Sequence, residues 1–208
     1  MKYIRVFCLF AVLSIAVGAM AQAKPGASPA AAPQAQTSQQ PPPTIGSTVD
    51  FQIGIIEREI VSAAEAMPED KFSFAPSSLN IAGSDYKGVR TFGQQVKHVA
   101  TVNFMLWSAL VGEKPPLDVN NGDGPASMTT KADIVKYLKD SYAMGHRAVK
   151  TLTTQNALEL LPAPFGPRPI PRLFFGTFAV AHGFDHYGQM VEYLRMNGIV
   201  PPASRGNN

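Results

Sequence analysis

Four segments of the sequence repeat apolar residues every three or four positions, which is the spacing of one face of an α-helix. The first segment runs from Ser47 to Met67, and its apolar stripe comprises Val49, Ile53, Ile56, Ile60, Ala64 and Met67. The others span about 90–111, 130–152 and 171–197. Helices with one apolar side must bury those sides, and a bundle of four buries all of them together. We therefore predict an all-α fold, a four-helix bundle.

The sequence between these segments supplies start and stop signals for the helices. Pro68 ends the first segment, and Thr130 with Asp133 forms an S/T-x-x-D start signal for the third. Five prolines within 162–171 exclude a helix there. The connections before the second and fourth segments are long enough for crossovers, and periodicity alone leaves the topology of the bundle open.

The N-terminus has the layout of a secretory signal. Lys2 and Arg5 precede an apolar run from Val6 to Ala19, which is shorter than the roughly 20 residues of a membrane-spanning helix. Ala19-Met20-Ala21 fits a signal-peptidase site, so we predict a signal peptide over 1–21 rather than an uncleaved anchor. The mature chain is then periplasmic or extracellular and has no membrane attachment.

A region with the composition of a disordered linker follows the signal. Residues 22–45 consist mainly of Ala, Pro, Gln and Ser, with six prolines and one charged side chain, Lys24. We expect the bundle to occupy 46–202 and a flexible tail to occupy 203–208. The single cysteine, Cys8, lies in the signal, so the mature chain has no disulfide and no cysteine nucleophile.

The charge of the chain argues against a nucleic-acid partner. Its formal net charge is +3, but two of its 18 basic residues are Lys2 and Arg5, within the signal. The basic residues outside the signal nearly balance the 15 acidic residues of the chain. They form no run of Lys or Arg that could neutralise a phosphate backbone. We expect a small-molecule substrate instead, whose identity the sequence does not give.

Three of the four histidines lie on apolar stripes. His182 and His186 are spaced i, i+4 on the fourth segment, one turn apart on one side, and His98 lies in line with apolar residues on the second. Burying three imidazoles without partners is costly, and one divalent metal ion would satisfy all of them. Such a three-histidine set leaves a coordination position for water or substrate. The alternative is a metal-free bundle with hydrogen-bonded core histidines. His146, at the edge of its stripe, is expected on the solvent side.

Two polar residues beside the histidine pair could support a metal site. Asp185 lies about 60° from His182 around the helix, where it could orient a histidine or lie on the surface, and the surface role is favoured. Gln189 could bond a ligand or bridge two helices as a buried amide. Position 183 is Gly, whereas the zinc-protease motif H-E-x-x-H requires Glu there, so that class is excluded.

These motifs resemble a known family. The stretch from His182 to Gln189, followed by Leu194-Arg195, Gly198 and Pro201, resembles the H-x-x-x-H-x-G-Q…LR-x-x-G-x-x-P signature of the final helix in DinB/YfiT-like metalloenzymes. The segment 95–100, which contains His98, is similar to that family's first-histidine motif. The similarity covers about residues 47–202.

The resemblance implies a DinB-like four-helix bundle in which His98, His182 and His186 hold a divalent metal, commonly nickel or zinc, often in a homodimer. Some members transfer or isomerise substrates with a low-molecular-weight thiol such as bacillithiol, mycothiol or glutathione. Those thiols are mainly cytoplasmic, so the export signal argues against thiol transfer here.

The resulting prediction is an exported divalent-metal-binding protein. By resemblance it would be a metal-dependent transferase or hydrolase, acting through a metal-activated water or thiol. The alternative is a non-catalytic binding or interaction module in which the metal is structural or absent.

Overall fold

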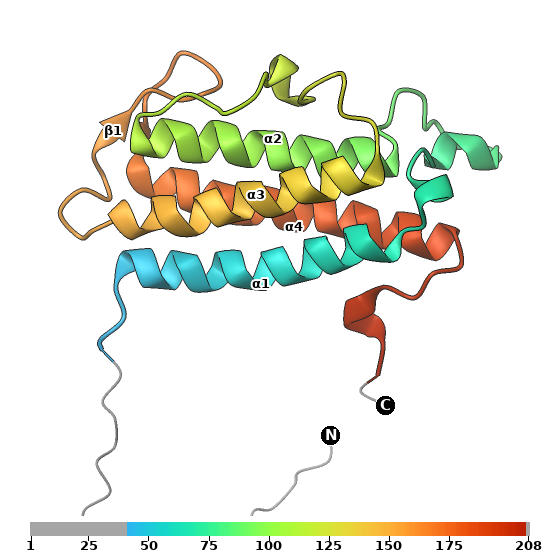
Figure 1. The fold of residues 1–208 in the computed structure, drawn as a ribbon, viewed down its shortest axis with the longest axis horizontal. Helices are drawn as coiled ribbons and strands as arrows, with labels where there is room; N and C mark the ends of the chain where they lie inside the picture. The colour runs from blue at the N-terminus through green and yellow to red at the C-terminus, as the bar shows by residue number, and fades with distance from the viewer. Residues whose placement is uncertain (1–40, 207–208) are drawn as a thin grey trace, which may run out of the picture. The chain divides into compact units, whose positions relative to one another are not determined.

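The computed structural model describes residues 41–206, and its four long helices form a bundle (Figure 1). They are α1 (Ile45–Ala66), α2 (Phe92–Val111), α3 (Lys131–Ala148) and α4 (Arg172–Met196). The predicted signal peptide and most of the predicted linker lie outside the described residues. The third helix is shorter than expected, because its last turn tightens into a 3-10 turn at Val149–Thr151.

Side-chain caps explain where three of the helices begin. Thr44 and Ser47 form a capping box at the start of α1, so this helix begins one residue inside the segment expected to be linker. An equivalent box of Thr91 and Gln94 starts α2. The Thr130 hydroxyl accepts a hydrogen bond from the Asp133 backbone N–H at 3.1 Å, as the start signal for the third helix predicts.

The helices are arranged so that α1 and α2 each pack against both α3 and α4. In Figure 1, α1 and α4 run in one direction and α2 and α3 run in the other. Because the neighbours α2 and α3 are parallel, the connection from 112 to 130 must return along the length of the bundle. It lies over α2 and contains the 3-10 turn Asn120–Gly122. The crossover therefore occurs at a connection where the sequence did not suggest one, whereas the connections from α1 to α2 and from α3 to α4 each join two helices at the same end of the bundle (Figure 1).

The apolar stripes meet in one core. Every member of the predicted stripe on the first helix is at most 4 % exposed. Trp107 of α2 is fully buried, and a Cβ at Gly145 of α3 would lie 2.8 Å from its ring, so a glycine is required for this close approach. Gly183 of α4 likewise lies against Ile56 of α1, where a Cβ would approach within 2.8 Å. Stripe burial thus confirms the helical periodicity.

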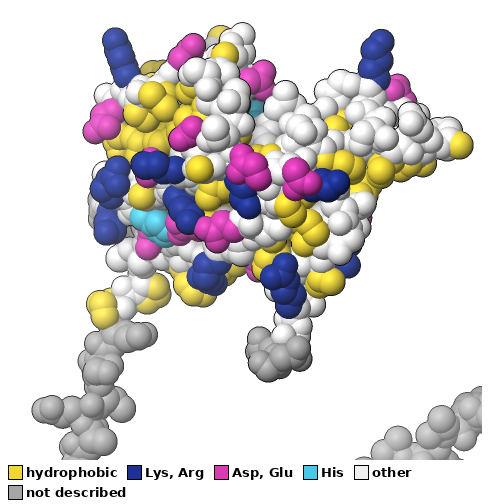
Figure 2. Space-filling view, turned by 45° about the vertical axis from the view of Figure 1, so that its right-hand side comes forward, with side chains coloured by type: hydrophobic (Ala, Val, Ile, Leu, Met, Phe, Trp, Pro, Cys, Tyr) yellow, Lys and Arg dark blue, Asp and Glu magenta, His cyan; other side chains and the backbone are white. Residues whose placement is uncertain are grey.

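The remaining elements are small. The connection between α3 and α4 forms a short antiparallel hairpin of β1 (Leu160–Leu161) and β2 (Ile170–Pro171). On the face shown in Figure 2, Lys and Arg side chains are interspersed with Asp and Glu, and apolar side chains lie between them. None of the helices in 41–206 has the length and apolar character needed to cross a membrane.

His146 of α3 contradicts the expectation of a solvent-side residue. Its ring is half-buried between two carboxylates of α1, with Nδ1 at 2.7 Å from Asp50 Oδ1 and Nε2 at 2.9 Å from Glu57 Oε2. Burial lowers the pKa of His146, but the hydrogen bonds to Glu57 and Asp50 outweigh burial and raise it above its ordinary value of 6.5. The protonated ring therefore ties α3 to α1.

This bridge makes a pH-dependent contribution to stability. A raised pKa in the folded state means that the contribution is fully present below pH 6.5 and disappears as the pH rises through the folded pKa. We expect His146→Gln to lower the free energy of unfolding in urea at about pH 5.5, by no more than about 1 kcal/mol, and to have little effect at about pH 9. The neighbouring exposed Arg147→Gln serves as control. An equal loss at both pH values would contradict the ionic bridge.

Candidate metal centre

The bundle brings the three inward histidines together. His98 lies on α2, and His182 and His186 lie one turn apart on the facing side of α4. The Nε2 atom of His182 is 3.3 Å from Nε2 of His98 and 3.1 Å from Nε2 of His186. The three potential ligand atoms all lie within 4.8 Å of one another. Residues 84 positions apart in sequence therefore share one point in the interior.

The outer ring nitrogens of two of these histidines are fixed by hydrogen bonds. Nδ1 of His98 donates to the carbonyl oxygen of Gly122 at 2.8 Å, and Nδ1 of His186 donates to Oε1 of Gln95 at 2.5 Å. Because a carbonyl oxygen can only accept, both Nδ1 atoms carry the proton and both Nε2 atoms present a lone pair. The two rings are therefore held in the tautomer that coordinates a metal through Nε2.

The donor set fits a divalent cation. His182 Nε2 faces two lone pairs and can donate a proton to only one of them, so one short N···N contact has no bridging hydrogen. Four-coordinate zinc, with Zn–N bonds of about 2.0–2.1 Å, places neighbouring ligand nitrogens about 3.3 Å apart. The observed separations of 3.1 and 3.3 Å match this spacing. A cation would satisfy all three nitrogens at once.

Electrostatics keep the three rings neutral. Burial, followed by the charged forms of His186 and His98, lowers the pKa of His182 to about 3. Burial and then the charges of His98 and Arg90 lower the pKa of His186 to about 4. Burial also lowers the pKa of His98. Neutral imidazole is the form that binds a metal, so the rings need not lose protons at neutral pH.

One wall of the site is aromatic. The ring of Phe178 stacks on His182 with centroids 5.8 Å apart, and Phe174 and the partly exposed Phe165 pack against Phe178. The Nδ1 atom of His182 is buried without a hydrogen-bond partner among the described residues. This wall limits the access of water to the His182 side of the cluster.

The side chains of the two supporting residues suggested by the sequence make no hydrogen bond to the histidines. Asp185 is exposed, as favoured, and it accepts a hydrogen bond from Gln189 Nε2 at 3.3 Å. Gln189 is also exposed, and its Oε1 accepts from Gln95 Nε2 at 2.8 Å, so it does bridge two helices but is not a buried amide.

Gln95 is the supporting residue that sequence reasoning missed. Its side chain is 3 % exposed and connects His186 to Gln189. The signal was present, since Gln95 precedes His98 by three positions and therefore lies on the same side of α2. Gly122 could not have been found in this way, because its carbonyl reaches His98 only through the crossover.

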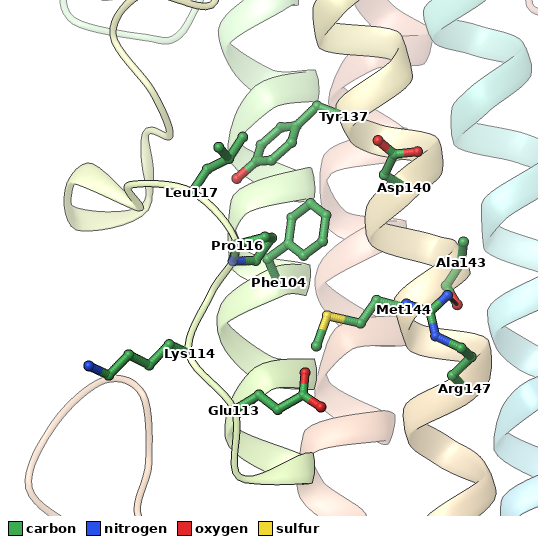
Figure 3. A pocket seen from close by; sticks show the side chains of 10 residues that line it. All are labelled: Phe104, Glu113, Lys114, Pro116, Leu117, Tyr137, Asp140, Ala143, Met144 and Arg147. Carbon is green, nitrogen blue, oxygen red and sulfur yellow. Dashed lines mark hydrogen bonds between the residues drawn. The ribbon is translucent and has the colours of Figure 1, made fainter.

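Two cavities of the bundle differ in whether they share a residue with the histidine cluster. One, of about 610 Å³, is lined by side chains of the segment before α2, the first turns of α2, the crossover and Gln189. The other, of about 420 Å³, lies between α2 and α3 and is shown in Figure 3. Its lining includes the apolar side chains of Phe104 and Met144 and the charged side chains of Glu113 and Arg147, and none of the three histidines lines it. The first cavity shares Gln95 with the histidine cluster.

Comparison with known proteins identifies the family. A family model of the DinB superfamily matches residues 52–190, which is more than half of the chain. The chain belongs to the DinB superfamily. A crystal structure of a DinB-like protein from Bacillus cereus has the same fold, with a TM-score of 0.55 at 19 % identity over 74 % of this DinB chain and 93 % of the other. No match was found among curated proteins. The predicted resemblance is confirmed.

The hydrogen bond from His186 to Gln95 gives a specific prediction for this DinB protein. Gln95→Leu should weaken binding of a divalent metal by about 10- to 100-fold, because a ligand that loses its hydrogen-bonded support is neither oriented nor held in the right tautomer. Competition of the purified protein with a coloured zinc chelator measures the affinity. Gln189→Leu is the matched control and should change it by less than about 3-fold, since the side chain of Gln189 hydrogen-bonds to Gln95 and Asp185 and not to a histidine. Wild-type affinity in Gln95→Leu would rule out the supporting role.

Proposed function

We propose that His98, His182 and His186 bind one divalent metal ion through Nε2 and that the protein uses it in a transferase or hydrolase reaction on a small molecule. The observation that carries the proposal is the convergence of three Nε2 atoms, at separations of 3.1 and 3.3 Å, from rings held neutral. Zinc and nickel both accept imidazole ligands, and the donor set does not choose between them.

A metal held by neutral ligands keeps its full charge and lowers the pKa of a bound water or thiol toward neutrality. The chain's own residues have separate tasks in such a site. Gln95 and Gly122 hold the protons on the outer nitrogens of His186 and His98, and Phe178 shields His182 from water. Within residues 41–206, no carboxylate bonds to a ring of the cluster. The site therefore supports activation of the nucleophile by charge rather than by an adjacent carboxylate base.

We place this activity outside the cytoplasm, because Lys2, Arg5 and the following apolar run have the layout of an export signal. Low-molecular-weight thiols are mainly cytoplasmic, whereas water is available on both sides of the membrane. Hydrolysis therefore fits this chain better than thiol transfer.

Cobalt substitution tests whether the centre is built for catalysis. Cobalt(II) takes the place of zinc, and its visible spectrum reports the coordination. With three protein ligands and one water, the spectrum should titrate with an apparent pKa within about one unit of 7, as the water loses a proton. A spectrum that is independent of pH, with four protein ligands, would instead support the non-catalytic module with a structural metal. Failure of untagged wild-type protein to bind any divalent ion would eliminate both the catalytic and the structural metal site.

A further inference from the structure

We propose that the 610 Å³ cavity beside the histidine cluster binds an anionic oxygen group, a carboxylate or a phosphate, and that Arg90 recognises it. The inference rests on the proposed function in one respect: the anionic group is assigned to the substrate. The cavity itself and its charge do not depend on a metal.

The cavity is polar and has an excess of positive charge. Its lining contains two cations, Arg90 and Lys97, against one carboxylate, Asp123, together with the amides of Gln94, Gln95 and Gln189. Such a lining offers hydrogen-bond donors to a small anion and little apolar surface to a hydrophobic ligand. The cavity in Figure 3 differs in this respect, because its two cations, Lys114 and Arg147, are matched by two carboxylates, Glu113 and Asp140.

Arg90 is oriented but retains free donors. Its Nε and Nη2 atoms both donate to the same oxygen of Asp123, at 3.3 and 3.0 Å. No described residue accepts a hydrogen bond from Nη1, and the side chain is 38 % exposed. The backbone is also fixed, since Tyr193 of α4 donates its hydroxyl proton to the Arg90 carbonyl at 3.0 Å. A planar guanidinium held in this way matches the paired oxygens of a carboxylate or phosphate.

The position of Arg90 connects the cavity to the histidine cluster. Gln95 lines the cavity and accepts a hydrogen bond from Nδ1–H of His186. Asp123, the partner of Arg90, directly follows Gly122, whose carbonyl holds His98. Arg90 also lies near enough for its charge to lower the pKa of His98 and His186. An anion bound at Arg90 is therefore placed beside the centre where the reaction is proposed to occur.

The competing explanation is that Arg90 only clamps the crossover through Asp123. Two variants separate the roles. Arg90→Gln removes the guanidinium, whereas Asp123→Asn breaks the ion pair but keeps the guanidinium and frees more of its donors. A clamp predicts that both variants act alike. Anion recognition predicts that they act in opposite directions.

The experiment measures binding of inorganic phosphate and, in a second arm, acetate by calorimetry. Wild type should bind at least one of them, Arg90→Gln should weaken that binding tenfold or more, and Asp123→Asn should strengthen it. Whether wild type binds phosphate or acetate shows which of the two anionic groups the cavity recognises. Equal binding by wild type and Arg90→Gln, or no binding of either anion by wild type, would overturn the proposal.

A further arm distinguishes this subsite from the metal itself. His182→Ala removes a proposed metal ligand and leaves Arg90 in place, so anion binding at Arg90 should persist in that variant. Binding that disappears in His182→Ala and survives in Arg90→Gln would locate the anion on the metal and overturn the role of Arg90. The metal content of Arg90→Gln, measured separately, should equal that of wild type, so the two proposals can fail independently.

Discussion

Replacing His98 or His182 by alanine is expected to remove the metal from the purified protein. Structural zinc sites bind with roughly 10–16 kcal/mol, so a share of about 4 kcal/mol for each of three ligands corresponds to a loss of about a thousandfold in affinity. Elemental analysis of protein prepared without a histidine tag should give about one metal per chain for wild type and background levels for either variant. The two residues lie on different helices, so equal losses indicate one shared ion.

The fourth histidine supplies the matched control for this prediction. His146→Ala removes an imidazole that bridges Asp50 and Glu57 and is not part of the cluster, so its metal content should equal that of wild type. A loss of metal in His146→Ala comparable to that in His182→Ala would show that the assay reports unfolding rather than coordination. Background metal in the wild type would favour hydrogen-bonded core histidines.

Metal binding should also change the stability of wild type but not of the ligand variants. An ion that binds only the folded chain raises the free energy of unfolding by about 2.7 kcal/mol at a concentration one hundred times its Kd. Thermal unfolding with and without added zinc therefore provides a second readout of the same site, and His182→Ala should not respond.

The parts of this structure that sequence predicts are those that depend on local spacing. The stripe from Val49 to Met67 recurs with the helical period, and the pair His182 and His186 is one turn apart whatever surrounds the helix. The capping residue Thr130 acts on its own helix. Such features require no knowledge of which helices are neighbours, and the structure confirms the expected geometry at each of them.

Features that depend on the packing of distant segments did not follow from spacing. His146 is held by Asp50 and Glu57 only because α3 packs against α1, and periodicity does not fix that pairing. The contact of His98 with Gly122 depends on the path of the crossover over α2. A buried amide bridge was one of two roles that the sequence left open for Gln189. It does bridge two helices, but it is exposed, and the buried amide of the pair is Gln95 on α2. In each case the missing information is topology.

Trp107→Ala is the substitution expected to cost the most stability. Trp107 is fully buried where α2 meets α3, and truncating such a side chain lowers the free energy of unfolding by about 3–5 kcal/mol through lost apolar contact and the cavity left behind. Denaturant unfolding of the metal-free protein measures the change. Phe51→Ala, at a position that is 70 % exposed, is the control and should change stability by less than about 0.5 kcal/mol. A cost for Trp107→Ala as small as that of the control would contradict the packing described here.

A double-mutant cycle with Gly145 tests the contact itself. Gly145→Ala alone should destabilise the protein, because the new Cβ would lie 2.8 Å from the Trp107 ring. In the Trp107→Ala background the obstructing ring is gone, so Gly145→Ala should lower the free energy of unfolding by less. The helix preference of alanine over glycine, worth up to about 1 kcal/mol, then acts in the opposite direction. Additive effects would show that the ring does not press on Gly145. Because Trp107 lies nine positions beyond His98 on α2, these variants should retain their metal while losing stability, the converse of His182→Ala.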